Sequence, residues 1–153
     1  LNSLKSPANE GGFTTPKVTA YSYYELEDME QQLLVVNIHA LNFVFLDEYK
    51  AHIMQAGEKI KTHQGPVIFA GDFNTNFPQG VAKEKFLFEY IKELGLENVV
   101  FFQDGRRQEH TECEIKNIID FIFIRGLAAS NAFVPSSGGA DHCPLIATLK
   151  LDS

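Results

Sequence analysis

Short apolar runs alternate along the chain with stretches in which apolar residues recur every three or four positions. The runs at 17–26, 33–41 and 67–72 are rich in β-branched and aromatic residues and predict three strands. The second run, "LLVVNIHAL", is almost continuously apolar, which is typical of a strand buried on both faces. The first two strands are expected to form a hairpin. Residues 1–16 are rich in Ser, Asn, Gly and Pro and predict a loop.

Two segments have the periodicity of a helix with one apolar face. Residues 43–65 form the first expected helix, which ends before Gly65 and Pro66. Its apolar face consists of Leu46, Tyr49, Ile53, Ala56 and Ile60. Residues 80–96 form the second expected helix, which ends at Gly95. Its apolar face consists of Leu87, Tyr90, Ile91 and Leu94.

The last third of the chain is less regular. Short strands are expected at 97–102, 117–126 and 145–151, separated by a polar loop at 103–116 and a turn-rich loop at 136–144. The whole pattern predicts an α/β chain of about six strands and two helices. We find no internal repeat and no linker, and we therefore treat residues 1–153 as one domain or part of one.

The composition narrows the classes of function. With 153 residues, of which 44% are hydrophobic and 22% charged, the chain suits a globular domain. Its net charge of −7 argues against a sequence-tolerant nucleic-acid binder, because such proteins gain affinity by neutralising phosphates. An acidic chain still cleaves a phosphodiester when metal ions supply the positive charge.

Location and redox state are only weakly constrained. No apolar run approaches the ~20 residues of a membrane helix, and no signal peptide is visible. The chain begins at Leu1, so we expect its natural N-terminus to be absent and leave the localisation open. Cys113 and Cys143 have neither metal-ligand spacing nor a disulfide pattern, and they do not indicate a redox compartment.

Polar side chains lie at or near the ends of four apolar segments. They are His39 in "VNIHA", Asp72 and Asn74 in "AGDFNT", Asp120 in "IIDFIF", and Asp141 with His142 in "ADHCPL". Burying a carboxylate without a partner is costly, so several of them at strand ends indicate a shared site. Taken alone, Asp72 and Asn74 suit a turn and His39 suits a core histidine. Asp141 and His142 alone suit a polar loop.

The combined set favours chemistry on a phosphate. Asp, Asn and His together are suited to binding Mg²⁺ or Mn²⁺ with a phosphate group. The two histidines add acid–base chemistry near neutral pH. The other histidines, His52, His63 and His110, are interpreted as surface residues, and the Arg pair of "GRR" at 105–107 as solvated charge.

Four motifs resemble, in order, the C-terminal half of the endonuclease/exonuclease/phosphatase superfamily, the deoxyribonuclease I-like group. They are "NIHALNF", "GPVIFAGDFNT", "IIDFIFIRGL" and "GGADHCPLIATL", and the resemblance extends over residues 17–151. It implies part of a four-layered α/β/β/α sandwich with mixed, mainly antiparallel sheets. It also implies hydrolysis of phosphate esters with a divalent metal, usually Mg²⁺.

The same resemblance implies a role for each residue of the first two motifs. His39 resembles the histidine that contacts the scissile phosphate and protonates the leaving group. Asp72 resembles the acid that orients or deprotonates the attacking water, and we also expect it to bind the metal. Asn74 resembles the amide that holds a phosphate oxygen.

Three further residues complete the expected site. Asp120 resembles the acid that orients the second histidine, and Asp141 resembles a metal ligand. His142 resembles the histidine that polarises the phosphate or acts as a base. Ala140 stands where the family usually has a serine, whose role we take as supporting.

About 100 residues of the family's N-terminal half, including a metal-binding Glu, have no counterpart here. We expect a fragment or partial domain whose exposed sheet face pairs with a second copy or with the missing half. We expect a metal-dependent phosphoesterase that hydrolyses a phosphodiester by attack of an activated water, with phosphate esters, nucleic acid among them, as substrates. The alternatives are an inactive binding or scaffold module and a phosphoesterase for lipid or inositol phosphates.

Overall fold

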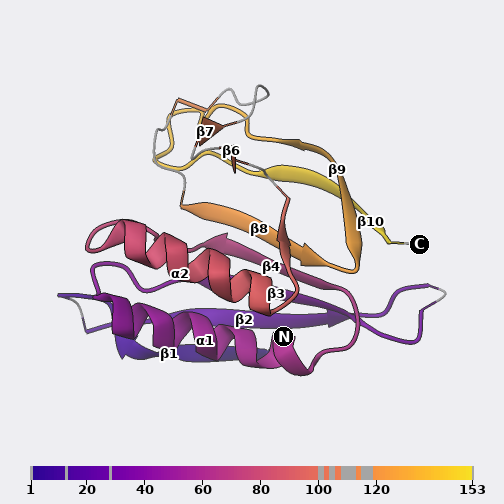
Figure 1. The fold of residues 1–153 in the computed structure, drawn as a ribbon, viewed down its shortest axis with the longest axis horizontal. Coiled ribbons are helices and arrows are strands. Elements are labelled where there is room, and N and C mark those ends of the chain that lie inside the picture. Colours follow the sequence, from indigo (N-terminus) through magenta and orange to yellow (C-terminus); the bar gives the residue numbers. More distant parts are fainter. Residues whose placement is uncertain are drawn as a thin grey trace.

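The structure, a computed structural model of the chain, describes residues 2–12, 14–27, 29–99, 102–103, 106–107, 113–114 and 119–152. It contains a helix layer, a large sheet and a smaller sheet (Figure 1). The helices are α1 (Leu46–Thr62) and α2 (Gly80–Glu93). Neither of these helices is long and apolar enough to cross a membrane.

The large sheet has six strands, and α1 connects two of its central ones. The strands are β1 (Asn2–Asn9), β2 (Pro16–Tyr24), β3 (Leu33–His39), β4 (Val67–Asp72), β5 (Glu97–Asn98) and β8 (Asp120–Arg125). Their order in the sheet is β1-β2-β3-β4-β8-β5. The pair β3–β4 is parallel, which requires a crossover connection, and the other four pairs are antiparallel.

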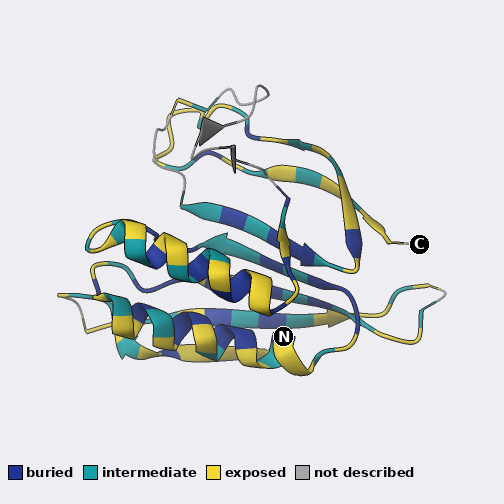
Figure 2. Ribbon diagram, viewed as in Figure 1, coloured by how far each residue is buried: buried dark blue, intermediate teal, exposed yellow. Residues whose placement is uncertain are grey.

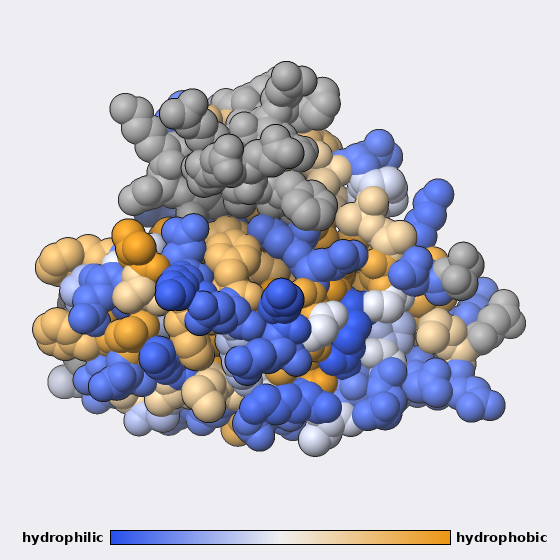
Figure 3. Space-filling view, viewed as in Figure 1, coloured by the Kyte–Doolittle hydropathy of each residue, from blue (hydrophilic) through white to orange (hydrophobic). Residues whose placement is uncertain are grey.

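Both helices cover one face of the large sheet (Figure 1). Tyr49 and Ile53 of α1 belong to a buried core with alternate residues of the central strands, which Figure 2 shows as dark blue segments. Within this core the ring of Phe73 lies 4.9 Å from that of Phe69 and 5.2 Å from that of Phe123. Because Phe73 directly follows β4, this aromatic packing anchors the end of that strand. Hydrophilic residues predominate on the outer surface over the helices (Figure 3).

A smaller sheet covers part of the opposite face. It is an antiparallel pair of β9 (Leu127–Phe133) and β10 (Ile146–Leu151). Ile124 and Leu127 are buried there with Val134 and Cys143 in a second core. A third, short pair is formed by β6 (Phe102–Gln103) and β7 (Arg106–Arg107). The predicted α/β fold with mixed, mainly antiparallel sheets is therefore confirmed.

Two predictions about strands are wrong. The expected loop at 1–16 contains β1, whose polar residues are mostly exposed because it is an edge strand held by pairing with β2. The strand at 33–41 is not buried on both faces. Leu34, Val36 and Ile38 are buried beneath the helices, whereas Asn37 and His39 are exposed on the other face.

The C-terminal third also differs from expectation. Of the strand expected at 97–102, residues 97–98 form β5 and Phe102 begins β6, while 100–101 lie outside the described residues. The loop expected at 103–116 contains the end of β6 and the whole of β7. β9 was not predicted, because "LAASNAF" has no β-branched residue and gains its stability from pairing with β10. The two helices and the strands at 17–26, 67–72 and 145–151 are confirmed within a few residues.

One side chain of β8 joins the ends of both helices. The guanidinium of Arg125 donates to the carbonyl oxygen of Leu94 at 2.9 Å, after α2. It also donates to Ile60 at 3.2 Å and to His63 at 2.6 Å, at the end of α1. Since the last carbonyls of a helix have no partner within the helix, Arg125 satisfies them and ties both helices to the sheet.

Replacing Arg125 tests this connection. Arg125→Ala should lower the free energy of unfolding by about 2–4 kcal/mol, because charge-assisted hydrogen bonds to part-buried carbonyls are lost. Arg125→Lys should lose less than Arg125→Ala, since the ammonium still donates to some of the three carbonyls. Urea unfolding of the three proteins measures the difference, and equal stability of all three would contradict the role.

His52 is not the surface residue that its isolated position in the sequence suggested. It is fully buried beneath the sheet, where Nδ1 accepts the N–H of Leu41 at 3.2 Å and Nε2 lies 3.3 Å from Oγ1 of Thr19. Burial lowers the pKa of His52 to about 4. His63 is half-buried, with Nε2 2.8 Å from the carbonyl of Gln32, and His110 lies outside the described residues.

The buried His52 predicts a loss of stability in acid. Its pKa is lower in the folded chain than the ordinary 6.5, so the unfolded chain binds the extra proton first and stability falls as pH drops from about 6.5 to 4. The contribution is on the order of 3 kcal/mol. His52→Gln should remove this part of the slope in chemical unfolding, whereas His63→Gln should retain it. An unchanged slope in His52→Gln would contradict the assignment.

Candidate active site

Three of the predicted residues form one row across the large sheet. The parallel register pairs His39 of β3 with Asp72 of β4, and the antiparallel register pairs Asp72 with Asp120 of β8. Residues in one row of a sheet project to the same side. The row therefore lies at one edge of the face opposite the helices, which agrees with the prediction of a shared site.

Gly71 allows β4 to approach β3 closely at this row. Its φ is 143°, and a Cβ placed there would lie 1.9 Å from the carbonyl oxygen of Ile38. No other residue type fits this position without movement of the backbone. Hydrogen bonds continue beyond the strand, because Ala40 donates to the carbonyl of Asp72 at 2.8 Å and Phe73 to that of Ile119 at 2.7 Å.

Asp72 is less accessible to solvent than His39, the histidine that lies beside it. Its Oδ2 lies 3.5 Å from Nε2 of His39, and their side chains are 18% and 53% exposed. Burial raises the pKa of Asp72 above its ordinary value, the N–H of Asn74 opposes this, and the charge of Asp120 adds to it. The half-exposed imidazole of His39 is thus placed to meet a ligand while Asp72 lies beside it.

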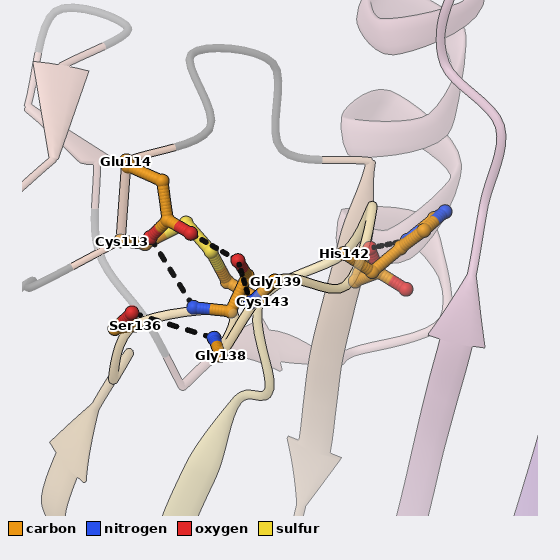
Figure 4. The surroundings of a disulfide bond; sticks show 9 residues. Cys113, Glu114, Ser136, Gly138, Gly139, His142 and Cys143 are labelled. Atoms are coloured by element: carbon orange, nitrogen blue, oxygen red, sulfur yellow. Dashed lines mark hydrogen bonds and ion pairs between the residues drawn. A yellow bond between two sulfur atoms is a disulfide. The ribbon is translucent and has the colours of Figure 1, made fainter.

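Asp120 is paired with the second histidine. Its Oδ2 lies 2.6 Å from Nδ1 of His142, which comes from the loop before β10 (Figure 4). This hydrogen bond raises the pKa of His142 above its ordinary value, although burial opposes the effect. The pairing that the resemblance implied between these two residues is present. It leaves Nε2 of the imidazole as the ring nitrogen that can face a ligand.

Asn74 is not one of the paired residues of the row but lies next to it, two residues after Asp72. It is buried in a left-handed conformation, with a φ of 46°. Its N–H donates to Oδ1 of Asp72 at 2.9 Å, and its side-chain amide donates to the carbonyl of Ala40 at 2.9 Å. Asn74 thus links the ends of β3 and β4, and the phosphate-binding role that the resemblance implies stays a prediction.

Asp141 is exposed on the loop next to His142, and its charge contributes to raising the pKa of that histidine. A cavity of about 530 Å³ opens between this loop and the sheet. Asp120 and His142 lie on its polar side, and Ala70, Ile122 and Leu145 are among its apolar residues. Asp120 of the row and His142 of the loop therefore border a space large enough for a small ligand.

The donor atoms of the site are chemically suited to Mg²⁺. Carboxylate oxygens are the preferred protein ligands of this ion, and a divalent cation relieves the repulsion between Asp72 and Asp120. In the described part of the chain, no three acids, histidines or cysteines that include Asp72 have their ligand atoms within 4.8 Å of one another. Mg²⁺ usually keeps several waters, so the two carboxylates expected to bind it, those of Asp72 and Asp141, are compatible with this ion.

The two cysteines, whose spacing in the sequence follows no disulfide pattern, are bonded to each other in the structure. Cys113 and Cys143 form a disulfide with their Cα atoms 5.9 Å apart (Figure 4). Ligand atoms of Cys113, Glu114 and Cys143 lie within 4.8 Å of one another, but the two sulfurs are bonded to each other and are not free to ligate a metal. The even number of cysteines was the one available signal, because partners 30 residues apart in a chain of two cysteines follow no motif.

Solved structures with the same architecture define the class of fold. An endonuclease/exonuclease/phosphatase from Bacteroides vulgatus has a TM-score of 0.68 at 14% identity, over 99% of this chain and 64% of that chain. One from Beutenbergia cavernae has 0.67 at 15%, over 98% and 44%. A mannosyl-6-phosphatase from Bacteroides thetaiotaomicron has 0.61 at 14%, over 98% and 65%. The chain therefore has the fold of endonuclease/exonuclease/phosphatase proteins.

The sequence relatives described here share one name, UPF0294 protein. A UPF0294 protein of Vibrio campbellii is 38% identical over 138 residues, which are 90% of this chain and 46% of that protein. A UPF0294 protein of Erwinia tasmaniensis is 41% identical over 118 residues, which are 76% of this chain and 41% of that protein. The chain thus spans about half the length of the curated relatives it matches. No family model matches the chain.

Removing the Asp120 carboxylate tests the second pair. Asp120→Asn should lower the pKa of His142 towards 6.5, because the hydrogen bond that the imidazole donates to Asp120 is the main cause of its rise. NMR titration of the imidazole in metal-free buffer measures the pKa. Asp141→Asn is the matched control and should lower it less, since Asp141 acts on His142 only through its charge. A larger effect from Asp141→Asn would contradict the assignment.

Proposed function

We propose that this chain contributes one side of the active site of a Mg²⁺-dependent phosphoesterase that hydrolyses a phosphodiester, as nucleases do. The observation that carries the proposal is the row of His39, Asp72 and Asp120, extended by the 2.6 Å contact of Asp120 with His142. Two imidazoles and two carboxylates gathered at strand ends beside a cavity supply the acid, base and anion-binding groups that such a reaction requires.

Asp120 and His142 act on the phosphate in this proposal. Nδ1 of His142 donates to the carboxylate of Asp120, which stabilises the protonated imidazole. Nε2–H then donates to a non-bridging phosphate oxygen, where negative charge increases in the transition state. Asp120 orients the ring and contacts no substrate.

Asp72 and His39 act on the attacking and leaving oxygens. Burial raises the pKa of Asp72, which makes its carboxylate a better proton acceptor for an incoming water. His39, more than half exposed, donates a proton to the leaving oxygen. A bound Mg²⁺, for which Asp72 and Asp141 supply carboxylate oxygens, would neutralise charge on the phosphate and lower the pKa of a bound water.

The fold is compatible with more than one phosphate ester. The neighbour from Bacteroides thetaiotaomicron is a mannosyl-6-phosphatase by name, so the fold is not confined to nucleases. The net charge of −7 disfavours tight duplex binding by this chain alone. Lipid or inositol phosphates are therefore the second substrate class, and an inactive binding module is the alternative to an enzyme. Pairing of the exposed sheet face with a second copy or another segment stays a prediction.

The proposal is tested on a longer protein that contains this chain and has the full length of the curated relatives. Mg²⁺ should support hydrolysis of a generic phosphodiester, EDTA should abolish it, and Asp72→Asn or His142→Asn should each lower kcat by about 10²–10⁴-fold. Plasmid DNA, abasic DNA, sphingomyelin and inositol phosphates, assayed in parallel, identify the substrate class.

Glu89→Gln is the control for these variants, because it removes an exposed carboxylate from α2, on the other side of the sheet. It should leave kcat unchanged. Full activity of Asp72→Asn would refute its role as base. A parent protein that hydrolyses none of the substrates with Mg²⁺ would favour the binding module.

A further inference from the structure

The loop that carries His142 is shaped at its start by hydrogen bonds of its own, which the N–H groups of Gly138, Gly139 and Ala140 donate to Ser136 and Ser137. We define the histidine loop as residues 136–143. Its residues Gly138 and Gly139 have φ values of 61° and 92°, and a Cβ at either would meet no atom within 4 Å. Residues 138–141 are exposed, and Cys143 is buried at 7% exposure. The position of this loop relative to the sheets depends in addition on contacts from elsewhere in the chain.

Two adjacent residues supply such contacts. Cys113 is bonded to Cys143, the residue after His142, and Glu114 holds the other end of the loop (Figure 4). The carboxylate of Glu114 accepts the hydroxyl of Ser137 and, at 3.2 Å, the N–H of the same residue. These bonds hold the pKa of Glu114 well below its ordinary value, so the carboxylate is charged at neutral pH.

His142 thus lies between two fixed points. On one side the 2.6 Å contact with Asp120 links its imidazole to the large sheet. On the other side its backbone is joined through Cys143 to the second core, which also contains Ile124 and Leu127. If the bond between Cys143 and Cys113 is broken, the exposed loop loses its covalent cross-link to the rest of the chain at the residue that follows His142.

We propose that the Cys113–Cys143 disulfide and Glu114 are positioning groups that hold His142 against Asp120, and that reduction of the disulfide weakens this contact. The consequence for catalysis rests on the function proposed above. The reductant is a dithiol, which transfers two electrons and two protons to the cysteine sulfurs. The S–S bond breaks, two thiols form, and the dithiol becomes a disulfide.

The first test is independent of activity. In metal-free buffer, the ring N–H of His142 that is hydrogen-bonded to Asp120 should give a low-field proton NMR signal in the oxidised chain, assigned by its absence in His142→Asn. Reduction with a dithiol should weaken or remove this signal, and so should the double variant Cys113→Ser/Cys143→Ser. Backbone amide signals of β3, β4 and α1 should stay in place, which separates loss of positioning from unfolding.

Glu114→Gln provides a variant that keeps the disulfide. It replaces one acceptor oxygen of the contact with Ser137 and should weaken the His142 signal less than reduction does. Glu97→Gln is its matched control, because it removes another exposed carboxylate, on β5, which pairs with Ile124 towards the other end of β8 from Asp120. An unchanged His142 signal in the reduced chain would overturn the proposal, even if Glu114→Gln had an effect.

The second test uses the full-length protein that shows phosphoesterase activity. Reduction should lower kcat at least tenfold with little change in KM, because His142 acts mainly in the transition state, and reoxidation should restore kcat. Equal kcat in both redox states would overturn the catalytic part. If the NMR signal depends on redox state but no phosphate ester is hydrolysed, the positioning device stands and the proposed function fails.

Discussion

The register of β4 against its two neighbours is the constraint on which the candidate site depends. It places Asp72 opposite His39 on one side and opposite Asp120 on the other. A shift by one residue would turn a strand's side chains to the opposite face, so the carboxylate of Asp72 would point into the aromatic core. Gly71 fixes the register at the critical point, because its missing Cβ leaves room for the carbonyl of Ile38.

The two faces of the large sheet have separate tasks. Under the helices, Phe69, Phe73 and Phe123 build a dry aromatic core that ends directly beside Asp72. On the other face the same strand ends present carboxylates and imidazoles that remain partly accessible to water. This division explains how the chain keeps several acids close together: each has a hydrogen bond, a histidine or solvent, so none carries the full cost of an unpaired buried charge.

The local sequence pattern was sufficient to predict the elements that depend on no distant partner in the chain. The helical spacing of Tyr49, Ile53 and Ala56 predicted α1, and polar residues after apolar runs predicted the row. The same pattern could also have predicted the burial of His52, because its position three residues after Tyr49 places it on the buried face of α1. β1 and the Cys113–Cys143 bond could not be predicted in this way, since each depends on a partner elsewhere in the chain.

The site therefore combines two kinds of order. His39, Asp72 and Asp120 are fixed by strand pairing, which is set by many backbone hydrogen bonds and changes little when one surface residue is replaced. His142 is held by contacts of its loop with other segments, those of its imidazole with Asp120, of Cys143 with Cys113, and of Ser137 with Glu114. Because fewer interactions hold it, the position of His142 is the part of this geometry most readily changed without unfolding the chain. The pairing of a rigid row with a separately held histidine confines any such change to one member of the site.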